Sequence, residues 1–202
     1  MSAATGDGRR SRVDAVVKIG GGLLAHPAHL ATALEAVAAA SARNRLLVVA
    51  GGGPFADAVR EVDRRIGLAD DAAHWMAILA MDQYAHLIAS RLARGVVAHD
   101  AEAVAAALGA GSLPVLAPFR WLREADPLPH SWDVTSDSIA AWIAGALGAP
   151  RLLLVKPPGA PAGDAALDAH FARALRPGTT HAVIPAERLR ELRDLGGAAA
   201  GR

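Results

Sequence analysis

The sequence predicts an α/β protein, a three-layer αβα sandwich around a mainly parallel central sheet. Short runs rich in Val, Leu and Ile alternate along the chain with longer segments of helical periodicity. Two of the early runs end in three consecutive glycines, at 20–22 and 51–53, and each glycine run precedes a helical segment. Strands that alternate with helices in this way form a parallel sheet that is covered on both faces.

Each expected element has a local signal. Strands are expected at the short apolar runs 13–19, 45–50, 96–98, 151–156 and 181–184, and a further apolar run lies at 113–118. Helices are expected where apolar residues recur at helical spacing, at 27–42, 54–65, 70–93, 101–108, 168–175 and 185–195, and within 131–148 after a polar loop. Pro54 suits the first position of its helix, because the N–H that proline lacks would be unpaired there. The segment 119–130 carries two prolines and is expected to be irregular.

Composition limits the class of protein. The 202 residues can bury a core, and we expect one domain, 13–202, after a disordered polar tail, 1–12. The net charge is +1 and the only basic block is 9–12, which argues against nucleic acid as a partner. The absence of cysteine excludes disulfides and thiolate metal sites, and no apolar run has the length of a membrane span. We therefore expect a soluble cytoplasmic protein with no membrane partner.

Lysine is rare in this chain. Only two of the 21 basic residues are lysines, Lys18 and Lys156, and each ends an apolar run that is expected to be a strand. A chain that otherwise uses arginine keeps lysine where the compact ammonium group is needed, although accidental placement is the alternative. Both lysines are therefore candidate functional residues.

A carboxylate stands at the start of the helix within 131–148. Thr135 and Ser136 are both suited to cap this helix, because a hydroxyl oxygen accepts a hydrogen bond from an unpaired N–H of the first turn. Asp137 follows, where the positive end of the helix dipole favours an ionised carboxylate. Asp137 either helps only to cap the helix or belongs to a site that includes the lysines.

The two glycine runs indicate an anion site. A strand, a glycine run and a helix form a phosphate site from backbone amides at the helix N-terminus. Ligands of open α/β sheets bind at the carboxyl ends of the strands, where both glycine runs are expected. The first run is not a Walker loop, because Lys18 precedes the glycines, and it lacks the spaced third glycine of a dinucleotide fingerprint.

Other polar residues are further candidates. Arg120, Arg123 and His130 are candidates to neutralise a phosphate group on a substrate, because guanidinium groups pair well with phosphate oxygens. His74, on the long helix, is either a substrate contact or a capping or surface residue. No HExxH spacing occurs, and we expect no metal ligand in the protein.

These motifs resemble the amino acid kinase superfamily. The resemblance rests on VVKIGGGLL, LLVVAGGGPFADAV and TSDSIAAWIA, and it covers about 13–156. Within the superfamily, AHWMAILAMDQYAHL and SWDVTSDSIAAW resemble the small archaeal-type kinases of 5-(aminomethyl)-3-furanmethanol phosphate, which act in methanofuran biosynthesis, and their relatives in methylotrophic bacteria. The resemblance implies a kinase with ATP and Mg²⁺ as cofactors and a homodimeric or higher state.

The resemblance also implies roles for the candidate residues. Lys18 would hold oxygens of the transferring phosphoryl group, and Asp137 would orient both lysines. The implied nucleotide contacts are Gly20, Gly21, Gly22, Ser136 and Lys156. The implied acceptor contacts are Gly51, Gly52, Gly53 and Thr135, with His74 and the two arginines and His130 as candidates. Residues 13–130 would then form the acceptor-binding half, and 131–202 a reduced nucleotide-binding half.

Two departures from the superfamily pattern leave alternatives open. Larger members carry a Thr-Asp pair after the strand that here ends in Lys156, and a further lysine downstream, whereas this chain has no lysine beyond Lys156. Lys156 supplies the second cation, or an arginine does, or the nucleotide half is too reduced for catalysis. The expected function is transfer of the γ-phosphoryl group of ATP to a small phosphomonoester. A non-catalytic nucleotide- or anion-binding protein and a uridylate kinase are the alternatives.

Overall fold

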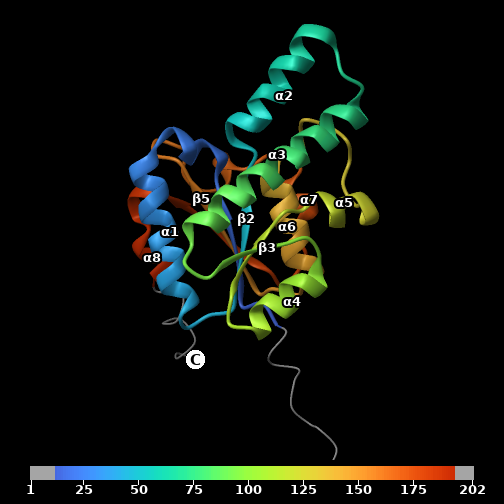
Figure 1. Ribbon diagram of the computed structural model, residues 1–202. Coiled ribbons are helices and arrows are strands. Elements are labelled where there is room, and N and C mark those ends of the chain that lie inside the picture. The colour runs from blue at the N-terminus through green and yellow to red at the C-terminus, as the bar shows by residue number, and fades with distance from the viewer. Residues whose placement is uncertain (1–11, 194–202) are drawn as a thin grey trace, which may run out of the picture.

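Six parallel strands form the central sheet of the protein, which is described from a computed structural model for residues 12–193 (Figure 1). The strands are β1 (Ala15–Ile19), β2 (Leu46–Ala50), β3 (Gly95–Ala98), β4 (Leu113–Leu116), β5 (Arg151–Lys156) and β6 (Thr180–Pro185). Their order in the sheet is β3-β4-β2-β1-β5-β6, and each neighbouring pair is parallel. The predicted αβα sandwich is confirmed. Residues 1–11 of the predicted tail lie outside the described part of the chain.

Helices cover both faces of the sheet. One face packs against α1 (Pro27–Ser41), the C-terminal half of α3 (Asp70–Arg91) and α8 (Arg190–Arg193). The other face packs against α4 (Ala101–Gly109), α5 (Phe119–Ala125), α6 (Ser136–Ala146) and α7 (Phe171–Ala174). Short 3-10 turns lie at η1 (Gly21–Ala25), η2 (Gly163–Ala166) and η3 (Ala186–Arg188).

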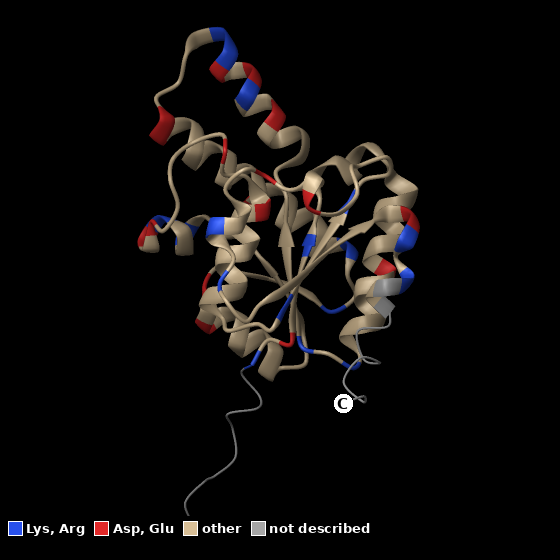
Figure 2. Cartoon of the chain, turned by 180° about the vertical axis from the view of Figure 1, so that it is seen from behind, with Lys and Arg blue, Asp and Glu red and all other residues tan. Residues whose placement is uncertain are grey.

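A helical hairpin extends past the carboxyl ends of the strands. It consists of α2 (Gly53–Ile66) and the N-terminal half of α3, and Figure 1 shows it projecting above the sheet. Only two residues of α2 are buried, Ala56 and Val59, and its exposed surface carries charged residues of both signs (Figure 2). Among residues 12–193, no helix is long and apolar enough to cross a membrane.

Three predicted elements differ from the structure. The prediction of an irregular segment at 119–130 is wrong for its first half, which forms α5. The Asp82 carboxylate of α3 accepts a hydrogen bond from the Phe119 N–H (3.1 Å), and Leu122 is buried in the core, so contacts far away in the sequence stabilise this helix. The predicted helix 168–175 is only four residues long. The predicted helix 185–195 divides into η3 and α8, and its last two residues lie outside the described part.

The strand order creates a crevice beside β1. The chain passes from β1 to β2 through α1 on one face of the sheet, whereas the connection from β4 to β5 runs through α6 on the other face. The carboxyl ends of β1, β2 and β5 therefore meet where the direction of the strand order reverses. This is the place where parallel sheets bind ligands.

Candidate functional site

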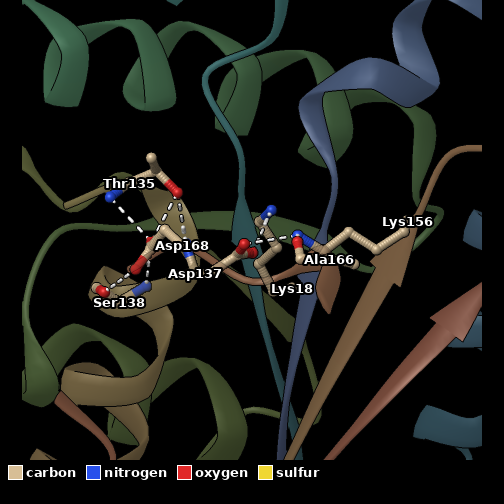
Figure 3. Close-up of polar contacts among 7 residues, drawn as sticks. All are labelled: Lys18, Thr135, Asp137, Ser138, Lys156, Ala166 and Asp168. Carbon is tan, nitrogen blue, oxygen red and sulfur yellow. Dashed lines mark hydrogen bonds and ion pairs between the residues drawn. The ribbon is translucent and has the colours of Figure 1, made fainter. Parts of the chain in front are cut away.

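Two lysines and one aspartate meet at this crevice. Asp137 Oδ1 lies 2.8 Å from Lys18 Nζ, and Asp137 Oδ2 lies 2.5 Å from Lys156 Nζ (Figure 3). Lys156 Nζ also donates a hydrogen bond to the Ala166 carbonyl oxygen (2.8 Å). One carboxylate thus holds two ammonium groups from neighbouring strands.

The alternation of side chains along β1 and β5 explains why Lys18 and Lys156 lie on the same face of the sheet. Val16 belongs to the core on the α6 side of the sheet, so Lys18, two residues later, extends its side chain to the same side. Leu152 and Leu154 lie on that side as well, and Lys156 continues their alternation. Strands β1 and β5 are neighbours, which brings the two ammonium groups together above the first turn of α6.

The cluster is almost entirely buried. The exposed fractions of Lys18, Asp137 and Lys156 are 4%, 3% and 8%. Burial alone raises the pKa of Asp137, but the charges of Lys18 and Lys156 outweigh this effect and hold its pKa below the ordinary value. Burial, together with the charge of Lys18, lowers the pKa of Lys156 despite the attraction of Asp137. With all three groups ionised, the cluster carries one excess positive charge, which suits an anionic ligand.

The first turn of α6 is fixed by hydrogen bonds from two sides. Thr135 is the N-cap, as predicted among two candidates, and its Oγ1 accepts a hydrogen bond from the Asp137 N–H (3.4 Å). Asp168, from the connection between β5 and β6, accepts hydrogen bonds from the N–H and hydroxyl groups of both Thr135 and Ser138 (Figure 3). Asp168 was not predicted as a site residue from the sequence, because its partners lie at least 30 positions away along the chain.

A cavity of about 350 Å³ opens above the cluster. Its walls are the two glycine loops, the α2–α3 hairpin and the segment that leads into α6. The residues that line it include Lys18, Gly21, Gly22, Gly52, Gly53, Asp57, Arg60, Asp70, His74, Ile78, Met81, Ser131, Trp132, Thr135, Ser136, Asp137 and Lys156. The cavity therefore brings together the predicted lysines, Asp137, both hydroxyls, His74 and part of each glycine run.

The glycine loops also pack tightly on each other. A Cβ atom on Gly21 would lie 2.1 Å from the Gly53 nitrogen, and one on Gly51 would lie 2.6 Å from the Gly21 nitrogen. A Cβ atom on Gly20 would lie 2.7 Å from the Val155 carbonyl oxygen. Gly20 and Gly51 do not line the cavity. The close approach of neighbouring backbone atoms explains why these two positions are glycine.

Replacing Gly21 with alanine is expected to destabilise the protein by about 2 kcal/mol or more, because the new methyl group meets backbone atoms that cannot rotate away. Gly109→Ala is the matched control, since a Cβ atom there meets nothing within 4 Å. The control should be neutral or slightly stabilising. Urea unfolding of both variants measures the difference, and equal stability of the two would contradict this tight packing of the loops.

His74 lies in the cavity wall and is buried. Its ring stacks on that of His130 with centroids 4.2 Å apart. Burial and the neighbouring His130 lower the pKa of His74 to about 4, so its imidazole is neutral near pH 7. His130 lies behind it and contacts two carboxylates, Asp71 and Asp126. Burial opposes the charge on His130, but these carboxylates raise its pKa above the ordinary value.

The His130 contacts are expected to make stability depend on pH. A histidine whose pKa is raised by folding contributes its full stabilisation below its unfolded pKa, about 6.5, and loses it as the pH rises through the folded pKa. His130→Gln should therefore lower Tm more at about pH 6 than at about pH 9. The exposed His26 supplies the control variant His26→Gln, and an effect of His130→Gln that is the same at both pH values would contradict the prediction.

The structure separates the candidate arginines from the cavity. Arg120 pairs with Asp100 and Glu124 on the surface, and Arg123 stacks on Trp75 with its Cζ 4.7 Å from the ring centroid. The guanidinium group that does line the cavity belongs to Arg60, which was not among the predicted site residues. Arg60 lies over the ring of Trp132 at 4.9 Å and pairs with Asp57 at 2.9 Å.

Known proteins with similar sequences include a family and a curated relative. Residues 15–157 match the Amino acid kinase family. A curated relative from Methanocaldococcus jannaschii, named (5-(aminomethyl)furan-3-yl)methyl phosphate kinase, is 28% identical over 140 residues. The matched region is 69% of this chain and 63% of the relative, so the chain spans less than two thirds of that relative's length.

Two solved structures share the fold. A uridylate kinase from Archaeoglobus fulgidus has a TM-score of 0.68 and 16% identity, over 91% of this chain and 96% of that one. A UMP kinase from Ureaplasma parvum has a TM-score of 0.55 and 17% identity, over 90% of this chain and 87% of that one. At these identities the likeness concerns the fold alone.

Proposed function

Because the chain belongs to the amino acid kinase family, we propose that it transfers the γ-phosphoryl group of ATP to a small acceptor. The observation that carries this proposal is the buried cluster of Lys18, Asp137 and Lys156 under the cavity. Phosphoryl transfer depends mainly on positioning and on neutralising the charge of the phosphoryl oxygens. Two ammonium groups fixed by one carboxylate supply both.

The two glycine loops divide the cavity between the substrates in this proposal. Gly21 and Gly22 offer backbone amides to the phosphates of ATP, together with Ser136. Gly52 and Gly53 stand at the N-terminus of α2, whose unpaired N–H groups suit an anionic acceptor. Thr135 lines the same cavity and is proposed as an acceptor contact.

Lys156 supplies the second cation of the site in this proposal. Its ammonium group shares Asp137 with Lys18 and is close enough to act on the same phosphoryl group. This arrangement supports the first of the three alternatives left open by the missing downstream lysine. The arginine alternative lacks such support, because no arginine other than Arg60 lines the described cavity.

Magnesium enters the site with ATP in this proposal. Both Asp137 oxygens contact lysines, so this carboxylate is not available as a metal ligand. Within residues 12–193 no group of three or more His, Asp or Glu side chains could hold a metal ion. Bound Mg²⁺ would neutralise phosphate charge on the nucleotide, and Lys18 and Lys156 would bind oxygens of the transferring phosphoryl group.

A phosphomonoester is the proposed acceptor, as in the name of the curated relative. The low pKa of Asp137 and its two lysine contacts make it a poor general base. A phosphate oxygen is already ionised at neutral pH and needs no base to attack the γ-phosphorus. We propose Arg60 as the guanidinium group that pairs with the acceptor, in place of Arg120 and Arg123. Neutral His74 and the apolar Ile78 and Met81 are suited to contact the body of the acceptor.

ADP release with a panel of acceptors tests this function. We expect turnover with 5-(aminomethyl)-3-furanmethanol phosphate, and little with carbamate or acetylglutamate. Turnover with UMP alone would identify a uridylate kinase instead. ATP binding without turnover on any acceptor would favour a non-catalytic nucleotide-binding protein, and Lys18→Ala provides the background rate.

We also propose that the protein forms at least a homodimer. Large apolar side chains on the α2–α3 hairpin are exposed, with Ile66 at 72% and Leu79 at 41%. Most homo-oligomers close about a two-fold axis, which would cover such residues in pairs. Light scattering at micromolar concentration should give at least twice the mass of the chain, and a monomeric mass would contradict the proposal.

A further inference from the structure

Asp168 contacts the phosphoryl-transfer cluster only through other residues. It does not line the described cavity, yet four donors of the first turn of α6 converge on it. Its Oδ2 accepts hydrogen bonds from Thr135 N–H (2.9 Å), Thr135 Oγ1 (2.7 Å) and Ser138 N–H (3.0 Å). Its Oδ1 accepts a hydrogen bond from the Ser138 hydroxyl. An ordinary helix cap needs fewer contacts than this, and Thr135 already supplies one.

The Thr135 hydroxyl connects Asp168 to Asp137 through two hydrogen bonds. A hydroxyl group has a single hydrogen, and here it is donated to Asp168. The lone pairs of Thr135 Oγ1 are thereby turned toward the Asp137 N–H, which they accept at 3.4 Å. Removal of the Asp168 carboxylate frees this hydroxyl to rotate and loosens the turn that carries Asp137.

The connection between β5 and β6, which carries Asp168, also binds the Lys156 ammonium group. The Ala166 carbonyl oxygen, two residues before Asp168, accepts a hydrogen bond from Lys156 Nζ at 2.8 Å. Figure 3 shows Asp168 on one side of Asp137, and Ala166 and Lys156 on the other. The connection between β5 and β6 therefore contacts both the helix of Asp137 and the ammonium group that Asp137 binds.

We propose that Asp168 is a positioning residue of the phosphoryl-transfer site, which holds the first turn of α6 so that Asp137 meets Lys18 and Lys156. This inference rests on the proposed kinase function for its kinetic consequences. A site that acts by electrostatic stabilisation needs its groups held within about 0.5 Å of the productive geometry, and residues behind the site supply that rigidity.

The charge of Asp168 has a second, independent effect. Burial and the charge of Lys18 on β1 lower the pKa of Lys156, whereas Asp137 on α6 and Asp168 on the β5–β6 connection oppose that shift. Replacing Asp168 with a neutral residue should therefore let the Lys156 ammonium lose its proton at a lower pH. Displacement of Asp137 would lower the pKa of Lys156 in the same direction, so the two effects add when the Asp168 side chain is removed.

Two variants separate geometry from charge. Asp168→Asn keeps a side chain of the same shape, with one oxygen that can still accept hydrogen bonds, but it removes the negative charge. Asp168→Ala removes all four hydrogen bonds as well. Asp164→Asn is the control on the same segment, because Asp164 is 77% exposed and contacts His181 at 2.8 Å, away from the cluster.

Steady-state kinetics well below Tm give the first readout. We expect Asp168→Ala to lower kcat roughly 10-fold to 100-fold with little change in the KM for ATP, because misplacement of about 1 Å is costly in the transition state. Asp168→Asn should retain more of kcat, and the alkaline limb of its pH–rate profile should move to lower pH. Asp164→Asn should match the wild type. A kcat of Asp168→Ala within twofold of the wild type would overturn the proposal.

A titration of the lysines gives a second readout that needs no activity. The chain has only two lysines, so protein labelled with a heavy carbon isotope at the lysine ε-carbon gives two lysine signals by NMR. Lys156→Arg assigns them. We expect the Lys156 signal to titrate at lower pH in Asp168→Asn than in the wild type and in Asp164→Asn, because the charge of Asp168 is lost. It should titrate at still lower pH in Asp168→Ala, because Asp137 is displaced from Lys156 as well. Equal titration of Lys156 in the Asn and Ala variants would overturn the proposal. A further shift in the Ala variant of a protein without turnover would leave the proposal standing while the kinase function fails.

Discussion

Replacing Asp137 with asparagine is expected to lower kcat by about 100-fold or more. The substitution keeps the shape of the side chain but removes the negative charge between Lys18 and Lys156, whose ammonium groups then repel each other. Asparagine caps helices about as well as aspartate, so a residue that only capped the helix would tolerate the change. The affinity for ATP should change less than kcat, because the role proposed for Asp137 is exerted mainly in the transition state.

The stability of Asp137→Asn is the control for this prediction. From the sequence alone, we expect the replacement to cost less than about 1 kcal/mol, as for an exchange of caps. The structure points to a larger loss, roughly 3 kcal/mol, because two buried ammonium groups lose their shared counter-charge. The rate must therefore be measured well below the Tm of the variant. Normal turnover of a folded Asp137→Asn protein would return this residue to a capping role.

Lys18→Ala is expected to reduce turnover roughly 1000-fold, the upper range for loss of one electrostatic contact to a transition state. Lys18→Arg should fail as well, since the guanidinium group is larger and planar and would not keep the contact of the buried Lys18 ammonium with Asp137. Initial rates and circular dichroism of both variants provide the measurement. A wild-type rate for Lys18→Arg would show that compactness is not the reason for lysine at this position.

The strands of the sheet and the three residues of the cluster could be predicted as candidates because their signals are local, whereas the contact of Asp137 with both lysines was implied by the resemblance to the superfamily. Lys18 and Lys156 each end an apolar run, and the alternation of a strand fixes the face on which each lies. The helix start at Thr135 and Asp137 is likewise visible in a few adjacent residues. Because the strands of a parallel sheet all end at the same edge, residues at their carboxyl ends are expected to lie near one another.

The contacts around the cluster could not be predicted, because they depend on tertiary packing. Asp168 meets Thr135 and Ser138 only when the β5–β6 connection folds back over α6, and no spacing in the sequence encodes that return. Arg60 enters the cavity wall because α2 packs on α3 and is held against Trp132. Arg120 instead lies on α5, a helix that depends on the distant carboxylate of Asp82.

Transfer of a labelled γ-phosphoryl group from ATP to the acceptor tests the central claim most directly. The protein, its Lys18→Ala variant and its Lys156→Ala variant would each be incubated with ATP that carries a radioactive γ-phosphate and with 5-(aminomethyl)-3-furanmethanol phosphate. The cluster of Lys18, Asp137 and Lys156 predicts a labelled diphosphate product with the unmodified protein and loss of that product in both variants. Equal labelling by all three proteins, or no labelled acceptor from a protein that binds ATP, would contradict it.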